Sequence, residues 1–231
     1  MRSLLPLLAL LLPLRSLAAD ATSAPDADPY QWLEDIQGAK ALDWVKARND
    51  LTAKRLTARA DYAPLYRDAL AALNSASRIP EVTPHGAYLY NFWQDATHVR
   101  GIYRRTTPAE FRKENPRWET VLDIDELARR EGKPWAFNGA IWRRPDETRC
   151  LIRLSPGGGD AAETREFHAG TLSFVANGFH LPSAKSAIAW RDADSVYVGT
   201  DFGPGSLTES GYPRIVKIWQ RDTPLSAAQM L

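Results

Sequence analysis

The stretch IWRRPDETRCLIRLS (residues 141–155) carries the pattern that decides the fold of this chain. It predicts a strand that ends in an aromatic residue, then an acidic turn, then an apolar strand. The same order returns in IAWRDADSVYVGT (residues 188–200), where Trp190 takes the place of Trp142. A strand unit that recurs after roughly 40 to 50 residues is typical of a β-propeller blade.

Further strand patterns lie on both sides of this repeat, among them YLYNFWQ, WETVLDI, WAFNGAIWR and PRIVKIWQ. We predict about three blades, over Arg78–Ile124, Trp135–Val175 and Ser186–Leu231. The fold class is therefore mainly β with N-terminal helices, and residues 78–231 are expected to form an incomplete β-propeller domain. Because propellers usually close with four to eight blades, we expect this chain to be a fragment of a larger propeller.

The residues before the predicted blades have no strand pattern and differ from them in composition. Residues 1–18 combine a positive start, the apolar run LLPLLALLLPL and a small-residue cleavage region, which is typical of a secretory signal peptide. The run is shorter than the ~20 residues that span a bilayer, so we expect no membrane anchor after cleavage. The protein would then be exported, to a periplasm or out of the cell. Residues 19–77 are interpreted as a linker and a helical segment, because apolar residues recur every three or four positions between Asp35 and Ala76.

The composition indicates a soluble globular protein and argues against several kinds of site. The net charge of +1 leaves no basic stripe for nucleic acid. Cys150 is the single cysteine, so no intrachain disulfide can form, and we expect it to be a small buried residue. The four histidines are dispersed and predict no metal site, and no motif predicts a cofactor. Eight tryptophans favour an aromatic core, with a secreted carbohydrate-binding protein as a weaker alternative.

Two stretches of the sequence are rich in glycine. SPGGGD (residues 155–160) is interpreted as a tight turn, because a phosphate loop would continue with Lys and Ser or Thr before a helix. GTDFGPGSLTESGY (residues 199–212) is either an inter-strand loop or a surface that meets a substrate or a neighbouring domain. No G-x-S-x-G motif occurs, and no catalytic residue is predicted in this chain.

The N-terminal stretch DPYQWLED (residues 28–35), followed by DWVKARN (residues 43–49), resembles the N-terminal segment of prolyl oligopeptidases. HGAYLYNFWQD and VRGIYRRT resemble the first propeller blade of that family, and SPGGGDAAETREF, LPSAKSAIAW and GTDFGPGSLTESGYP are similar to a bacterial branch of it. The resemblance implies part of a seven-bladed propeller that gates the access of short peptides to a serine endopeptidase. It also implies that the N-terminal segment packs on an α/β-hydrolase domain, through a domain-docking motif made of Asp28, Pro29, Tyr30, Trp32, Leu33, Glu34 and Trp44.

The same resemblance implies where the chemistry resides. The serine, aspartate and histidine of the family belong to the missing C-terminal hydrolase domain, so this chain alone is expected to be inactive. Lys185 matches a substrate-facing position that is often aromatic in the family, and a lysine there would favour an acidic substrate group. The alternative for Lys185 is a solvated residue at the start of a strand. For the whole chain, the alternatives are a non-catalytic propeller-like binding module or the product of a pseudogene.

Overall fold

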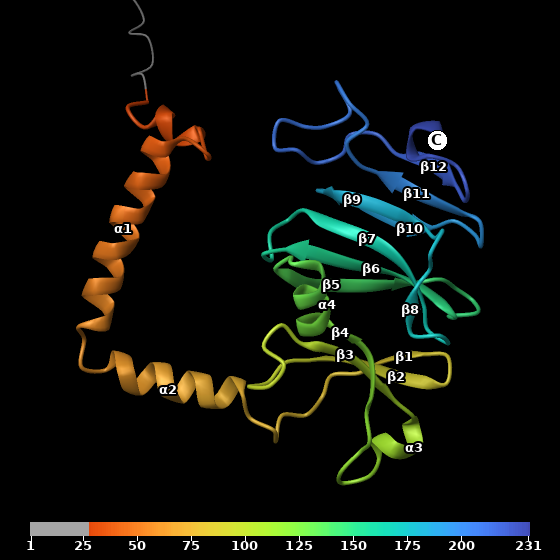
Figure 1. The fold of residues 1–231 in the computed structure, drawn as a ribbon, viewed down its shortest axis with the longest axis horizontal. Coiled ribbons are helices and arrows are strands. Elements are labelled where there is room, and N and C mark those ends of the chain that lie inside the picture. Colours follow the sequence, from red (N-terminus) through yellow and green to blue (C-terminus); the bar gives the residue numbers. More distant parts are fainter. Residues whose placement is uncertain (1–27) are drawn as a thin grey trace, which may run out of the picture. The chain divides into compact units, whose positions relative to one another are not determined.

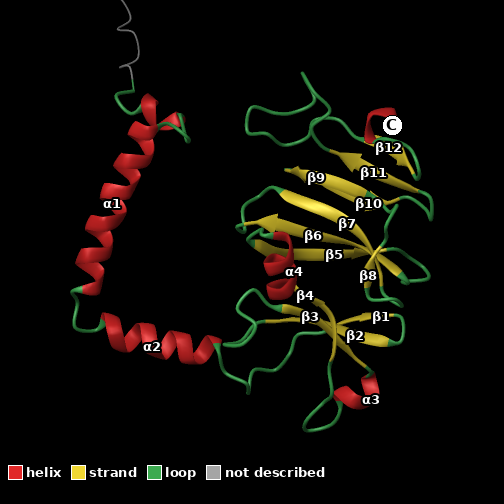
Figure 2. Ribbon diagram, viewed as in Figure 1, coloured by secondary structure: helices red, strands yellow, loops and turns green. Residues whose placement is uncertain are grey.

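The computed structural model describes residues 28–231, and the chain divides after Leu65 into two compact units. The predicted signal peptide, residues 1–18, lies outside the described residues. Helices dominate the start of the described chain and strands the rest (Figure 2). Within residues 28–231, no helix combines the length and the apolar character that crossing a bilayer requires.

The helical pattern predicted between Asp35 and Ala76 forms two separate helices. After the short helix η1 (Gln31–Glu34) come α1 (Ala39–Thr57) and α2 (Tyr62–Leu73). Helix α1 is rich in alanine, lysine and arginine, which favour helix formation, and its last turn carries Lys54 and Arg55 near the negative end of the helix dipole. Pro64 lies in the first turn of α2, where a missing N–H costs no hydrogen bond.

Residues 66–231 contain three antiparallel sheets, which we call blades 1, 2 and 3 (Figure 1). Blade 1 consists of β1 (Thr83–His85), β2 (Tyr88–Trp93), β3 (Ile102–Thr106) and β4 (Glu119–Asp123). The connections of this blade include two short helices, α3 (Pro108–Phe111) and α4 (Ile124–Glu131). The side chains of Thr107 and Asp123 accept backbone N–H bonds at the starts of these helices, and Gly132 ends α4 with a left-handed φ of 64°.

Blade 2 consists of β5 (Trp135–Trp142), β6 (Arg149–Pro156), β7 (Ala162–His168), β8 (Ser173–Phe174) and β9 (His180–Ala184). Strands β8 and β9 share the same edge of β7, each pairing with one part of it. Blade 3 consists of β10 (Ala187–Trp190), β11 (Ser195–Gly199), β12 (Lys217–Gln220) and β13 (Gln229–Met230), with the short helix η2 (Leu225–Ala227) before its last strand. The prediction of a mainly β fold with N-terminal helices and about three propeller blades is confirmed.

Strand β6 lies at the centre of the packing because both of its faces are buried. Cys150, Ile152 and Leu154 belong to the apolar cluster between blades 1 and 2, whereas Leu151 belongs to the cluster between blades 2 and 3. Side chains alternate between the two faces of a strand, so the unbroken apolar run of β6 supplies two cores at once. Cys150 has no exposed surface, as the sequence predicted.

The tryptophans that mark the sequence repeat occupy equivalent positions in blades 2 and 3. Trp142 is the last residue of β5 and Trp190 the last residue of β10. Each reaches the preceding blade: the Trp142 indole donates to the hydroxyl of Tyr103 at 3.2 Å, and the Trp190 indole donates to the carbonyl of Ile141 at 2.9 Å. The repeat therefore encodes one blade-to-blade contact per blade.

Candidate functional site

Lys185 connects three loops at one end of blades 2 and 3. It lies between β9 and β10, and its Nζ donates to the carbonyl oxygen of Ser210 at 2.9 Å. The same nitrogen lies 3.6 Å from the carboxylate of Asp160 and 4.5 Å from the centre of the Tyr212 ring. We call Asp160, Lys185, Ser210 and Tyr212 the Lys185 cluster.

A second contact closes the Lys185 cluster. The hydroxyl of Tyr212 donates to Oδ2 of Asp160 at 3.0 Å, and this hydrogen bond to a carboxylate raises the pKa of Tyr212 above its ordinary value. Asp160 therefore forms an ion pair with Lys185 and accepts a hydrogen bond from Tyr212. Lys185 lies just before the β10–β11 hairpin, and Tyr212 lies in the loop that follows it. The cluster ties the turn between β6 and β7 to the long loop between β11 and β12.

Both glycine-rich stretches connect neighbouring strands of one blade. SPGGGD forms the predicted turn between β6 and β7, with φ of 74° at Gly157 and 83° at Gly158, where a residue with a side chain would be strained. The longer stretch GTDFGPGSLTESGY lies between β11 and β12 and is closed by the backbone bond from Thr208 N–H to the carbonyl of Tyr212 at 2.8 Å. The structure thus makes it an inter-strand loop, and its binding role stays a prediction.

The contacts of Lys185 define what this residue can do. Its side chain is about one-third exposed, and its ammonium group has three donors. One of them bonds to the carbonyl of Ser210, whereas Asp160 forms an ion pair with the same group at 3.6 Å. The ammonium group can therefore donate a further hydrogen bond to a polar group that approaches from solvent. The substrate-facing role of Lys185 stays a prediction, and its contacts add a second role, that of fixing the two loops beside it.

The domain-docking motif forms a small structure of its own in the first unit. The Trp32 indole donates to the carbonyl of Pro29 at 3.0 Å and meets Trp44 edge to face, with 6.1 Å between the ring centres. The Asp28 side chain accepts the backbone N–H of Tyr30 at 2.8 Å, and the N–H of Leu33 donates to the Tyr30 carbonyl at 2.8 Å. These local bonds fix the backbone of the motif around the two indoles.

The large apolar side chains near this motif remain exposed to solvent. Tyr30 exposes 58% of its surface, and Ile36 exposes 73%. Glu34 is also exposed. Helix α1 adds a series of exposed apolar side chains, namely Leu42, Val45, Leu51 and Leu56. An amphipathic helix normally buries such residues against a partner surface.

A buried ion cluster between blades 2 and 3 was not predicted from the sequence. The Glu166 carboxylate, on β7, accepts bonds from Arg149 at 2.7 Å and from Arg221 at 2.9 and 3.1 Å. It also accepts the backbone N–H of Phe179 at 3.0 Å, and its side chain has no exposed surface. Burial alone would raise the pKa of Glu166, but the bonds from Arg221 and Arg149 outweigh burial and lower it.

A second polar contact that sequence reasoning missed joins blade 1 to blade 2. His85 stacks on Trp142 with 4.4 Å between ring centres, and its Nδ1 lies 3.2 Å from Oε1 of Glu147. Glu147 also accepts the backbone N–H of Gly86 at 2.7 Å, which is the largest cause of its lowered pKa. The only sequence signal was the acidic turn PDET, which we interpreted as a turn alone.

The described residues also bear on metal binding and nucleophilic chemistry. No group of three or more His, Cys, Asp or Glu side chains within residues 28–231 has the geometry to hold a metal ion. Burial strongly raises the pKa of the Cys150 thiol, which keeps it protonated and unreactive. In the same range, no serine hydroxyl is hydrogen-bonded to a histidine.

Comparisons with known proteins identify the family. The family described as prolyl oligopeptidase, N-terminal β-propeller domain, matches residues 18–231. An uncharacterized peptidase of Sinorhizobium fredii, y4nA, is 42% identical over 204 residues, and the match covers 87% of this chain and 28% of that protein. The uncharacterized peptidase RP174 of Rickettsia prowazekii is 29% identical over 209 residues, covering 87% of this chain and 29% of that one.

Solved structures lead to the same family. A post-proline cleaving enzyme from Rickettsia typhi superposes with a TM-score of 0.80 at 30% identity, covering 87% of this chain and 30% of that one. Oligopeptidase B from Leishmania major, at 17% identity and a TM-score of 0.63, shares the fold. The chain thus spans less than a third of the length of the relatives that it matches. With its three blades and its DPYQWLED segment, this chain belongs to the prolyl oligopeptidase family, in which it corresponds to the N-terminal β-propeller domain.

Proposed function

We propose that this chain is the N-terminal and propeller part of an exported prolyl oligopeptidase-type serine endopeptidase that acts on short peptides. The likeness to the post-proline cleaving enzyme of Rickettsia typhi carries this proposal, because it combines 30% identity with a TM-score of 0.80 over 87% of the chain. The chain covers 30% of that enzyme, so the proposed catalytic domain corresponds to sequence beyond the part that is matched here.

In the proposed enzyme, the hydrolase domain performs catalysis and the propeller controls the access of substrates. A Ser–His–Asp triad in the hydrolase domain performs acyl transfer, with the serine attacking the peptide carbonyl and the histidine moving the proton. The propeller carries no reacting group and restricts access to short peptides. The 231-residue chain alone therefore has no peptidase activity.

The exposed N-terminal motif is proposed to dock this chain onto the hydrolase domain. Tyr30 and several apolar residues of α1 are exposed in the described chain, although large apolar residues gain about 1.5 to 3 kcal/mol each from full burial. The hydrolase domain would cover them. Replacing Tyr30 with Ser should weaken association with a separately produced hydrolase domain without changing the stability of the blades.

Three measurements test the proposed function. An immunoblot against the propeller region should show a native product several-fold heavier than 25.8 kDa, the mass of this chain. N-terminal sequencing of that product from cell fractions should place its start near Ala19 if residues 1–18 are removed on export. The purified 231-residue chain should leave a proline-containing chromogenic peptide uncleaved.

The outcomes separate the proposal from its alternatives. A native product of 25.8 kDa would contradict the two-domain enzyme and favour a non-catalytic binding module. Cleavage of the chromogenic peptide by the purified chain, blocked by a serine-directed phosphonate, would contradict the assignment of catalysis to a separate domain. An uncleaved N-terminus in a cytoplasmic fraction would contradict export.

A further inference from the structure

Arg153 differs from every other arginine in the described chain that is at least partly buried. Each of the others donates a hydrogen bond to a carboxylate, a side-chain amide or a backbone carbonyl. The guanidinium of Arg153 is also partly buried, yet within residues 28–231 it makes no hydrogen bond and no ion pair. Because a guanidinium keeps its charge when it is withdrawn from water, this position favours an anionic acceptor.

Strand β6 places Arg153 on the face of blade 2 that meets blade 3. Leu151, two residues earlier, belongs to the apolar cluster between these two blades, and side chains two apart on a strand share a face. Ile152 and Leu154, on either side of Arg153, belong to the cluster between blades 1 and 2. Both blades that flank Arg153 are present in the described chain, so this position lies away from the outward faces of blades 1 and 3.

The carboxylates on this side of blade 2 already have partners. Glu166 lies on the same face, but its oxygens accept bonds from two other arginines. Asp160, in the turn after β6, forms an ion pair with Lys185 and accepts a hydrogen bond from a tyrosine hydroxyl. Neither carboxylate is bonded to Arg153.

A β-bulge in β5 leaves space beside Arg153. The register of β5 on β6 shifts between Phe137 and Ala140, so Asn138 and Gly139 together stand opposite Arg153. Gly139 has a left-handed φ of 101°, and a Cβ added to it would meet no neighbouring atom within 4 Å. Asn138 is exposed, and its side-chain amide has no partner within residues 28–231. The bulge therefore offers both room and an unused amide next to the guanidinium.

The bulged strand lies on the central side of the blades. Strand β5 is an edge strand of blade 2, and it contacts β10, the first strand of blade 3. At the end of β10, the Trp190 indole donates to the carbonyl of Ile141 on β5. The first strands of these neighbouring blades thus converge, and propeller blades surround a central channel. A molecule in that channel can reach the space beside Arg153.

We propose that Arg153 is a specificity residue, which pairs with the carboxylate of an Asp or Glu side chain in a peptide substrate. The planar donors of a guanidinium match the two oxygens of a carboxylate, and the amide of Asn138 can add a further hydrogen bond. A single unpaired cation balances one negative charge, which favours a carboxylate over a dianionic phosphate. That the ligand is a peptide rests on the proposed peptidase function.

Binding of blocked peptides to the 231-residue chain tests the pairing without requiring catalysis. The probes for fluorescence anisotropy are labelled peptides that contain Ala-Glu-Ala or Ala-Gln-Ala and are blocked at both ends. At low salt the glutamate peptide should bind about five- to tenfold more tightly, because only the carboxylate forms charge-assisted hydrogen bonds. A third peptide, Ala-Ala-Ala with a free C-terminus, tests whether a terminal carboxylate replaces the side chain.

Four variants locate the binding. Arg153→Gln should abolish the preference for glutamate, and Arg153→Lys, which keeps the charge but loses the planar donors, should reduce it to about threefold or less. Asn138→Asp places a carboxylate at an exposed position opposite Arg153 and should weaken glutamate binding several-fold. Arg112→Gln removes the same charge from an exposed arginine outside blades 2 and 3, and this control should change neither peptide.

The native product that carries this chain separates the role of Arg153 from the proposed function. Glutamate peptides, used as internally quenched substrates, should be cleaved with a higher kcat/KM than their glutamine counterparts. Arg153→Gln should remove this difference mainly through KM. Cleavage of neither peptide would contradict the proposed peptidase function, and the anisotropy result would still decide whether Arg153 binds a carboxylate.

The binding results can go against the inference in three ways. Equal binding of the glutamate and glutamine peptides, or an unchanged glutamate preference in Arg153→Gln, would overturn the assignment of Arg153. Unchanged glutamate binding in Asn138→Asp, a variant of an exposed residue, would contradict a carboxylate site at the bulge. Tighter binding of the peptide with a free C-terminus would overturn the assignment to an acidic side chain.

Discussion

Replacing Glu166 with Ala tests how blades 2 and 3 are held together. The Glu166 carboxylate is fully buried between Arg149 and Arg221 and accepts four hydrogen bonds. The substitution removes the carboxylate that pairs with Arg149 and two of the bonds of Arg221, which keeps its bonds to Asp194 and to the carbonyl of Ala193. The side chains of Arg149 and Arg221 expose only 31% and 17% of their surfaces. Removing one partner of a buried ion pair costs about 3–5 kcal/mol, chiefly through the unpaired charge that remains.

This free-energy cost can be converted into a shift of the melting temperature. A domain of roughly 150–250 residues loses about 2–4 °C for each kcal/mol, so Glu166→Ala should lower the melting temperature by roughly 10 °C. Differential scanning calorimetry measures this shift directly. The matched control is Glu126→Ala, which breaks an exposed pair with Arg129 and should cost about 1 kcal/mol or less.

The dependence on pH gives a second readout for the same residue. Because the pKa of Glu166 is lowered in the folded state, its stabilising contribution is complete above the ordinary carboxyl pKa of 4.5. The contribution is lost as the pH falls below that value and the folded-state carboxylate takes up a proton. Glu166→Gln cannot titrate, so its stability should vary less with pH in this acidic range than that of the natural chain.

Two results would refute this reasoning. If Glu166→Ala were no more destabilising than Glu126→Ala, the buried cluster would not contribute to blade packing. If Glu166→Gln kept the full acid sensitivity of the natural chain, the lost stability would come from other carboxylates.

Three further substitutions test other parts of the fold. Lys185→Met removes the cation that joins two loops, so limited proteolysis within residues 200–212 should become several-fold faster, while the free energy of unfolding changes by about 1 kcal/mol or less. Asp95→Asn removes a carboxylate whose pKa is lowered to about 2. The variant should therefore lose less stability than the natural chain as the pH falls from about 4 to 2. An unchanged dependence of stability on pH in this range would contradict this. Gly101→Ala should lower the free energy of unfolding by about 2–4 kcal/mol, because φ is +97° and the added Cβ would lie 2.4 Å from the Phe92 ring. The control Gly86→Ala, with φ of +57° and open space around the added Cβ, should lower it by about 1 kcal/mol. Equal losses of stability in denaturant melts would rule out the clash.

The strand hairpins could be predicted because their determinants are local. Alternating apolar residues and an acidic turn recur in the two Trp-ended hairpins, so the β5–β6 and β10–β11 units are visible in a single sequence. The elements that were missed are short or depend on a partner. Strand β1 spans three residues, and β9 exists through its pairing with β7. Strands this short hold too few residues to show an alternating pattern.

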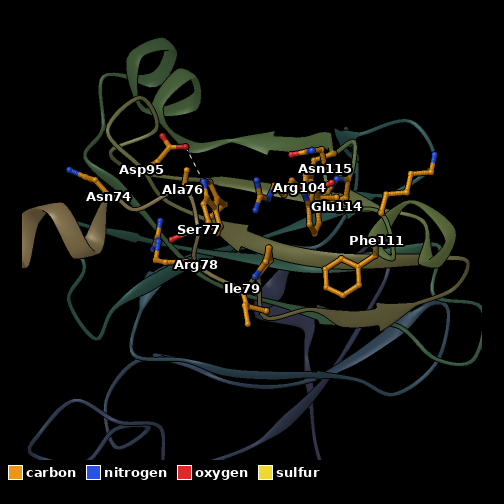
Figure 3. Close-up of a pocket in the computed structure, with 15 residues that line it drawn as sticks. Asn74, Ala76, Ser77, Arg78, Ile79, Asp95, Arg104, Phe111, Glu114 and Asn115 are labelled. Atoms are coloured by element: carbon orange, nitrogen blue, oxygen red, sulfur yellow. Dashed lines mark hydrogen bonds between the residues drawn. The ribbon is translucent and has the colours of Figure 1, made fainter.

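The candidate sites were less predictable for a related physical reason. Glu166 lies in an ordinary alternating strand, and its partner Arg221 follows 55 positions later. Arg104 is likewise one of two adjacent arginines. Arg105 faces blade 2 and bonds to Tyr90, whereas Arg104 lines the pocket on the opposite face of the sheet (Figure 3). The strand period assigns the two arginines to opposite faces. It does not indicate which face meets another blade.

The position of a blade in the row determines the chemistry of its two faces. Blade 2 is covered by apolar clusters on both sides, and its central strand β6 carries apolar residues toward both. Among residues 28–231, blade 1 contributes apolar side chains to the cluster that it shares with blade 2, and its opposite face carries Arg104 between the indoles of Trp93 and Trp118. The faces of these blades therefore differ in composition, a difference that the strand period alone does not reveal.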